Sequence, residues 1–221
     1  MPDRLANDKL ERLLQDCPFM RVMTIADKGL IYRQGDSCAR IYWIIRGTVK
    51  LEHLTPDGNA LTIALLRRGD FLGHLRYESL AERMDETARA IGQVDLYRCA
   101  EHGFRELLAQ QRDLCEHVFI RLSTRLRKAE RKLRSALTQS VETRVVETLK
   151  ELSDVFGIRC VHGYALEIHL TQQELADLVG ANRSVVSTVM NDLRSRGLLD
   201  YTRDLICVHD QAFVDFSGAL A

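Results

Sequence analysis

The sequence predicts an α+β protein in three successive parts: a β roll, one long helix and a C-terminal helix-turn-helix. Short β-rich runs broken by glycine and aspartate fill residues 22–99, a heptad repeat fills 111–138, and two amphipathic helices joined by a glycine fill 171–197. We therefore divide the chain into domains 1–110, 111–138 and 139–221. Its 221 residues suit two modest domains joined by a connector.

The first domain begins with a helix over residues 8–16, on which Leu10, Leu13 and Leu14 share one face. Strand-like runs follow at 41–45, 48–54 and 61–66, with a turn at 56–59. Such closely spaced strands favour an antiparallel roll. The turns between them carry glycines that can adopt a positive φ or let two backbones approach closely: Gly35, Gly47, Gly58, Gly69 and Gly73.

Residues 111–138 predict one long helix with a narrow apolar seam and many basic residues between the seam positions. A stripe this narrow is too thin to bury a helix in a globular core and is typical of a two-stranded coiled coil. We therefore predict that the helix pairs with a second copy of the chain. The seam consists of Cys115, Phe119, Leu122, Leu126, Ala129, Leu133 and Ala136.

The region 141–156 has apolar residues at helical spacing and ends at Gly157, and the alternation of Leu166, Ile168 and Leu170 predicts a short strand. Thr171 and Glu174 then form a capping box, which predicts the start of a helix.

A glycine turn separates that helix from the next one. Gly180 suits the left-handed turn, and Asn182 suits the cap of a second helix over 182–196. Two short helices joined in this way form a helix-turn-helix. We expect four residues of the second helix to face inward: Val185, Val186, Val189 and Leu193.

The outer face of the second helix is polar and predicts contact with double-stranded DNA. Arg183 can bind guanine through two hydrogen bonds, and Ser184 and Thr188 can contact other bases. Residues 198–201 and 205–208 predict a wing hairpin. We assign the DNA backbone to Thr171, Ser187, Asn191, Arg194 and Arg203, with Arg196 as a further phosphate candidate.

The ordered glycine turns, the long helix and the helix-turn-helix together resemble the catabolite activator / fumarate–nitrate regulator (CRP/FNR) family over nearly the whole chain. The resemblance implies a cyclic-nucleotide-binding-type jelly roll as sensor, a dimerisation helix and a C-terminal winged helix-turn-helix. It also implies a homodimeric transcription regulator that reads a palindromic operator and has RNA polymerase as a partner. Arg183, Ser184 and Thr188 match positions where relatives read bases, although relatives often carry glutamate in place of Ser184.

The effector is left open by the residues at the matching positions. Relatives that bind cyclic AMP offer a Glu and an Arg-Ser pair, where this chain has His74 and Glu86-Thr87. An anion in place of a phosphate-binding cation argues against cyclic AMP. A different acidic ligand, or none, remains an alternative. The candidate effector residues are His74, Arg76, Arg83, Glu86, Thr87, Arg89, Ala129 and Glu130, the last two replacing the hydroxyls that relatives offer to the purine.

The six cysteines are scattered without a C-x-x-C pair, so we expect free, mostly buried thiols and no metal. Iron–sulfur relatives carry several cysteines near the N-terminus, where this chain has only Cys17, so that cofactor is disfavoured. Haem is disfavoured as well, because a lone histidine is usually a surface residue. Its conceivable ligands are His74, Cys99, His102 and His117.

The charge is zero overall but unevenly distributed, at +5 for residues 1–137 and −5 for 138–221. The acidic DNA-binding half departs from the usual basic footprint, although a recognition surface needs only a few well-placed cations. We expect a cytoplasmic protein without a membrane segment, and no catalytic motif suggests an enzyme. The alternatives are a cyclic-nucleotide- or haem-responsive regulator of the same family, or a ligand-binding regulatory module that does not bind DNA.

Overall fold

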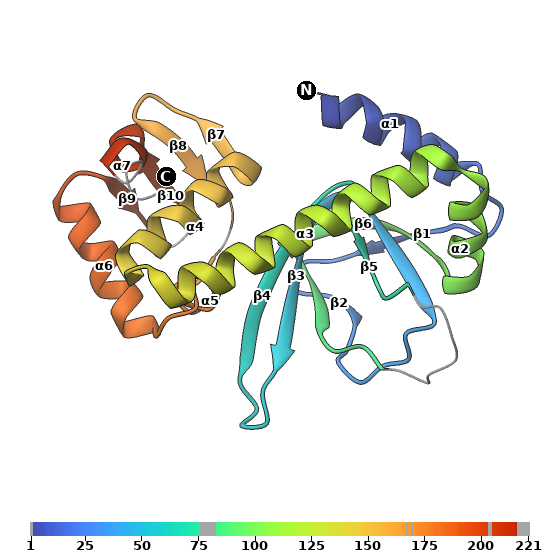
Figure 1. Ribbon diagram of the computed structural model, residues 1–221, viewed down its shortest axis with the longest axis horizontal. Helices are drawn as coiled ribbons and strands as arrows, with labels where there is room; N and C mark the ends of the chain where they lie inside the picture. The colour runs from blue at the N-terminus through green and yellow to red at the C-terminus, as the bar shows by residue number, and fades with distance from the viewer. Residues whose placement is uncertain (1, 76–82, 167, 169, 203–204, 216–221) are drawn as a thin grey trace. The chain divides into compact units, whose positions relative to one another are not determined.

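The computed structural model describes residues 2–75, 83–166, 168, 170–202 and 205–215, with side chains from residue 8 onward. Two compact units, Met1–Arg127 and Lys128–Ala221, make up the chain (Figure 1). The division between them falls within the long helix.

The first unit is an antiparallel β roll accompanied by helices. Its helices are α1 (Pro2–Gln15), α2 (Glu101–Gln110) and the first part of α3 (Arg112–Thr138). Its strands are β1 (Arg21–Ile25), β2 (Leu30–Tyr32), β3 (Arg40–Leu54), β4 (Ala60–Leu66), β5 (Phe71–Leu72) and β6 (Thr87–Ala100). The sheet runs in the order β1-β6-β3-β4, with β2 paired to β6 and β5 paired to β3. This arrangement confirms the predicted β roll.

The two strands expected at 41–45 and 48–54 are one continuous strand, β3, so that expectation is wrong. Gly47 falls where the register of β3 against β6 shifts, and its φ is +93°. A Cβ atom at this position would lie 2.4 Å from the carbonyl oxygen of Gln93. The glycine therefore marks an irregularity that lets β3 approach β6, and it does not end the strand.

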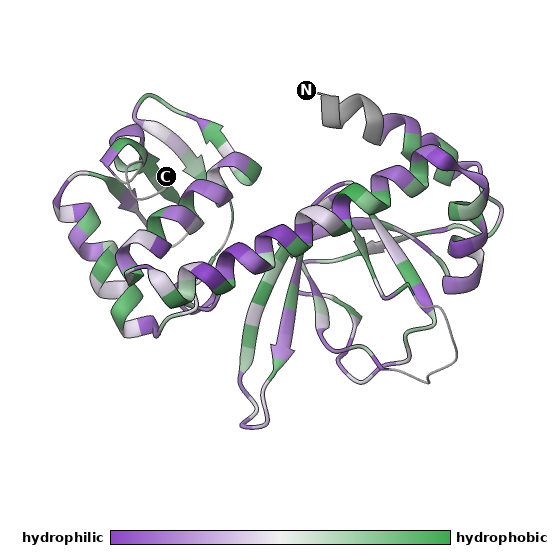
Figure 2. Cartoon of the chain, viewed as in Figure 1, coloured by the Kyte–Doolittle hydropathy of each residue, from purple (hydrophilic) through white to green (hydrophobic). Residues whose placement is uncertain are grey.

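Two buried clusters hold the first unit together. One lies within the roll and contains Tyr32, Ile44 and Leu96. The other joins the roll to the helices and contains Trp43, Phe104 and Leu114. Figure 2 shows the strands mixing hydrophobic and hydrophilic residues, whereas α3 is mostly hydrophilic with interspersed apolar residues.

The second unit contains the rest of α3 and the C-terminal elements. Its helices are α4 (Val141–Phe156), α5 (Gln172–Val179), α6 (Arg183–Ser195) and α7 (Asp210–Asp215). Its strands are β7 (Gly157–Arg159), β8 (Gly163–Leu166), β9 (Leu199–Tyr201) and β10 (Ile206–His209), in the order β7-β8-β10-β9. The predicted helices and wing strands are confirmed. The strand expected over 166–170 is wrong, because β8 ends at Leu166, and the buried Ile168 and Leu170 lie beyond it.

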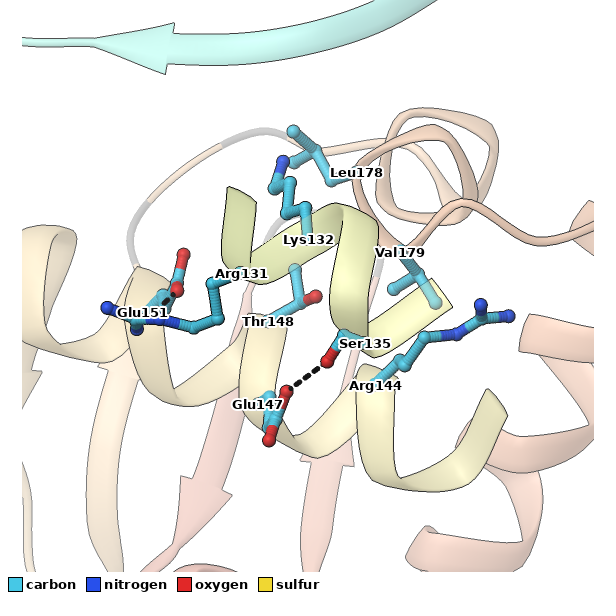
Figure 3. Close-up of a pocket in the computed structure, with 9 residues that line it drawn as sticks. All are labelled: Arg131, Lys132, Ser135, Arg144, Glu147, Thr148, Glu151, Leu178 and Val179. Carbon is cyan, nitrogen blue, oxygen red and sulfur yellow. Dashed lines mark hydrogen bonds and ion pairs between the residues drawn. The ribbon is translucent and has the colours of Figure 1, made fainter. Parts of the chain in front are cut away.

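Polar contacts fasten the end of α3 to α4 within the second unit (Figure 3). The Ser135 hydroxyl donates to a Glu147 carboxylate oxygen at 2.9 Å, and Arg131 pairs with Glu151 at 3.0 Å. These four residues line a small pocket together with Leu178 and Val179 of α5. The last turns of α3 therefore contact α4.

The structure also bears on the expected absence of a membrane helix and on the state of the cysteines. Among the described helices, none is both long and apolar enough to cross a membrane. All six cysteines are free, but only Cys38 and Cys99 are buried, so the expectation of mostly buried thiols is wrong.

Candidate nucleic-acid interface and sensor positions

Local capping defines where α5 begins and ends. The Thr171 hydroxyl accepts a hydrogen bond from the Glu174 backbone N–H at 3.1 Å, and the Glu174 carboxylate accepts one from the Thr171 N–H at 2.8 Å. At the other end Gly180 adopts φ +70°, in the left-handed region that glycine tolerates best. This turn redirects the chain so that α6 begins at Arg183.

One face of α6 is buried and so fixes the rotation of the helix about its own axis. Val186, Met190 and Leu193 are at most 2% exposed, and α6 packs against α4, α5 and β9. Val185, expected to face inward, is 41% exposed, so that prediction is wrong. The buried positions are spaced by four and three residues, and Met190 occupies the inward position that sequence reasoning gave to its neighbour Val189, which is only half-buried.

The opposite face of α6 presents polar side chains. Arg183, Ser184 and Thr188 are exposed, and Ser187 is partly buried. Among the described residues, no hydrogen bond or ion pair engages the Arg183 side chain, which leaves its guanidinium available. The Thr188 hydroxyl donates to the Ser184 carbonyl at 3.0 Å, so its methyl group and an oxygen lone pair remain for a ligand. Asn182 occupies the cap position, but its side chain makes no capping hydrogen bond, contrary to expectation.

Tyr201 of β9 contacts two side chains in the C-terminal half of α6, and sequence reasoning missed this residue. Its hydroxyl donates to the Asn191 side-chain oxygen at 2.7 Å, and the Arg194 guanidinium lies over its ring, 5.4 Å from the centroid. An aromatic residue in a wing strand, ten positions beyond Asn191, was the available signal.

Thr171 is exposed at the start of α5, and Arg203 lies outside the described residues.

Arg196, named above as a phosphate candidate, is already engaged within the protein. Its guanidinium lies 2.5 Å from a Glu142 oxygen and 3.1 Å from an Asp192 oxygen. These contacts connect the end of α6 to α4, so Arg196 helps to position the helix.

In the roll, Glu86, one of the candidate effector residues, is a buried carboxylate. Glu86 is 7% exposed. It accepts a hydrogen bond from the Tyr32 hydroxyl at 2.8 Å, and His74 Nε2 lies 3.6 Å from its other oxygen. Burial alone would raise the pKa of Glu86, but the nearby His74 ring and the hydrogen bond from Tyr32 outweigh burial and hold that pKa below its usual value. Burial and the adjacent carboxylate raise the pKa of Tyr32.

The other candidate effector residues do not form a shared anion site in the described structure. Arg83 donates to the Gly35 carbonyl at 2.8 Å, and Arg89 donates to the Lys28 carbonyl at 2.9 Å. Thr87 is buried and accepts from the Gln34 N–H at 3.0 Å. Arg76 lies outside the described residues, and Ala129 and Glu130 are exposed on the part of α3 that belongs to the second unit.

The apolar seam of α3 lies on the surface of the single chain. Phe119 is 70% exposed, Leu126 60% and Leu133 65%. The remaining seam residues, Cys115, Leu122, Ala129 and Ala136, are exposed as well.

Comparison with known families matches both parts of this architecture. Residues 23–111 match the cyclic nucleotide-binding domain, and residues 143–212 match the Crp-like helix-turn-helix domain. The chain is 30% identical to the cAMP-activated global transcriptional regulator Vfr of Pseudomonas aeruginosa, over 86% of this chain and 88% of that one. It is 27% identical to the global nitrogen regulator of Synechocystis, over 86% and 84% of the two chains.

Solved structures show the same fold. A transcriptional regulator of the CRP/FNR family from Thermus thermophilus is 27% identical, with a TM-score of 0.73 over 90% of this chain and 98% of that one. The c-di-GMP responsive regulator CLP of Xanthomonas campestris has a TM-score of 0.76 at 24% identity, over 90% and 97% of the two chains.

Replacing Tyr32 with phenylalanine should destabilise the fold by about 1–3 kcal/mol at neutral pH, because it removes a donor from a buried carboxylate. The folded-state pKa of Glu86 is lowered, so the stability from this carboxylate is present above its unfolded pKa and is lost as the pH falls through the folded pKa. The difference between variant and wild type should therefore shrink below about pH 4. Urea unfolding at several pH values measures it.

Tyr97→Phe is the matched control, because Tyr97 is buried in the other core cluster of the same unit. A loss for Tyr32→Phe that does not change with pH would refute a role for the Glu86 carboxylate.

Proposed function

The chain belongs to the CRP/FNR family of DNA-binding transcription regulators, and we propose that it works as a homodimer that reads a palindromic operator through α6. The observation that supports this proposal most strongly is the division of α6 into two faces. Val186, Met190 and Leu193 are buried, whereas Arg183, Ser184 and Thr188 are exposed. A helix anchored on one side and polar on the other can enter the major groove.

In this proposal, the side chains on the exposed face of α6 have different roles. Arg183, in the first turn of α6, is placed to bind guanine O6 and N7. Ser184 and Thr188 lie one turn apart on the same face and contact neighbouring bases. Thr171, Ser187, Asn191 and Arg194 contact the sugar-phosphate backbone and so position the helix without reading sequence.

The exposed seam of α3 supports the dimer. Side chains such as Phe119 and Leu133 are more than half exposed, and burying apolar surface contributes about 25 cal/mol per Å². A second α3 packed along the seam would remove these side chains from water and place two copies of α6 about 34 Å apart, one turn of DNA.

The roll acts as the sensor, and we propose that it does not respond to cyclic AMP through the family's phosphate contact. Vfr is named as cAMP-activated, but here the buried Glu86 presents a negative charge with Tyr32 and His74 as its partners. A carboxylate at this position repels a cyclic phosphate. In this proposal the roll either binds an effector of different chemistry or binds no effector. RNA polymerase is the partner through which the DNA-bound dimer regulates transcription.

Arg183→Ala and Arg194→Ala form a matched pair that tests base reading. Loss of Arg183 should weaken operator binding by about 1–3 kcal/mol, or roughly 5- to 150-fold, with a much smaller effect on random-sequence DNA. Loss of Arg194 should weaken both complexes to a similar extent and reduce the salt slope by about one. Fluorescence anisotropy titrations at several salt concentrations measure both. An equal loss on operator and random DNA for Arg183→Ala would contradict the assignment.

Leu126→Glu should convert the dimer to a monomer, because it places a charge within the apolar seam while leaving the monomer core intact. Sedimentation velocity at a series of concentrations measures the change. Val22→Glu is the control, since Val22 is 66% exposed on β1 and is not a seam residue. A wild-type chain that stays monomeric at every concentration, or a Leu126→Glu variant that still pairs, would refute the proposed dimer.

A further inference from the structure

The second unit contains the same cysteine-x-histidine triplet twice, and the proposed function gives neither copy a role. The copies are Cys160-Val161-His162 and Cys207-Val208-His209. The second copy lies on β10, where alternate residues point to the same face of the sheet. The first copy lies in the turn that joins β7 to β8. Both triplets offer soft sulfur and nitrogen donors.

The sheet brings the two triplets together although 44 residues separate them. The Cys160 N–H donates to the Gly163 carbonyl at 3.0 Å, and Gly163 is paired with His209 of β10. A Cβ atom at Gly163 would lie 2.1 Å from the Val208 carbonyl oxygen, so only glycine permits this approach. As a result, the Cys160 and Cys207 sulfurs are 3.6 Å apart, and the rings of His162 and His209 stack with centroids 5.3 Å apart.

The donor atoms have the spacing of a metal site. One ligand atom each from His162, Cys207 and His209 lies within 4.8 Å of the others. Zinc–sulfur bonds of about 2.3 Å and zinc–nitrogen bonds of about 2.0 Å require tetrahedral ligands to lie roughly 3.3–3.8 Å apart. The 3.6 Å between the two sulfurs falls in that range. Cys160 joins the three-residue group through this contact with Cys207, and the other donor atoms, which lie within 4.8 Å of one another, would have to move closer to bind an ion.

The surroundings of His209 determine which of its ring nitrogens can bind a metal ion. Its Nδ1 lies 2.7 Å from the Gly197 carbonyl, a contact that requires Nδ1 to carry the proton and leaves the Nε2 lone pair available in the neutral ring. Asp200 lies 3.6 Å from Nε2 and would pair with a protonated ring. Beside a bound cation, the same carboxylate contributes favourable negative charge.

We propose that Cys160, His162, Cys207 and His209 bind a zinc ion. Three clustered donors from His162, Cys207 and His209, with the Cys160 sulfur beside Cys207, favour Zn²⁺ over the hard cations that prefer oxygen. The side chain of His162 is exposed, which gives the ion a path from solvent. The bound ion would join the β7–β8 turn to β10 and so stabilise the DNA-binding unit. The proposal does not depend on DNA binding, because it concerns the free protein.

The test uses the full-length, reduced, metal-free protein titrated with Co²⁺ and then with Zn²⁺. The wild type should bind one ion per chain, show the visible absorption of tetrahedral Co²⁺ together with a thiolate charge-transfer band, and lose both when Zn²⁺ displaces Co²⁺. Zinc should also raise the melting temperature. His162→Ala and Cys207→Ser should each weaken zinc binding by at least about 100-fold, the upper end of the loss seen for partners outside the ligand set.

His102→Ala and Cys17→Ser are the matched controls, since both residues lie in the first unit and should leave zinc binding unchanged. His162→Ala keeps the test decisive if Cys207→Ser fails to fold, because the exposed His162 ring is not part of the core. The proposal is overturned if the reduced wild type gives no thiolate band, if His162→Ala binds zinc as the wild type does, or if the two thiols form only a disulfide.

Discussion

The burial of one face of α6 is the constraint on which the rest of the account depends. Val186, Met190 and Leu193 pack inside the second unit, and a helix with three anchors on one side cannot rotate about its axis. Arg183, Ser184 and Thr188 must then face solvent. The capping box at Thr171 and the left-handed turn at Gly180 set where α6 starts, and the ion pair between Arg196 and Glu142 holds its far end to α4. Local chemistry at both ends thus fixes the surface that we propose binds DNA.

The two units differ in the polar contacts that bear on the proposed function. In the second unit, the contacts of Ser135 and Arg131 join the last turns of α3 to α4. The C-terminal end of α3 therefore belongs to the same unit as α6. In the first unit, the buried Glu86 carboxylate has Tyr32 and His74 as its partners. These contacts support the proposal that the chain keeps the DNA-binding helix of its family but not the family's phosphate contact.

The parts of the fold set by local sequence were predictable, and those set by distant packing were not. Helix boundaries at α3, α4, α5 and α6 follow from periodicity, capping residues and glycines close in sequence. The extent of β3 and the position of β8 depend on pairing with strands far along the chain, and both were misplaced. Val185 was assigned to the wrong face because two adjacent valines are equally apolar in the sequence. Only the packing of α6 against α4 and α5 determines that Val186 is buried and Val185 is exposed. The two Cys-x-His triplets were missed because a search for C-x-x-C spacing cannot find donors that only a sheet unites.

Selection of operator sequences from a random pool of duplex DNA by the purified wild-type protein tests the central claim most directly. The account predicts enrichment of a two-fold symmetric sequence whose half-sites have centres about 10 base pairs apart, with a conserved guanine in each half that becomes variable when Arg183→Ala is used for the selection. A pool that stays random, or an enriched sequence without symmetry that Arg183→Ala selects unchanged, would contradict it.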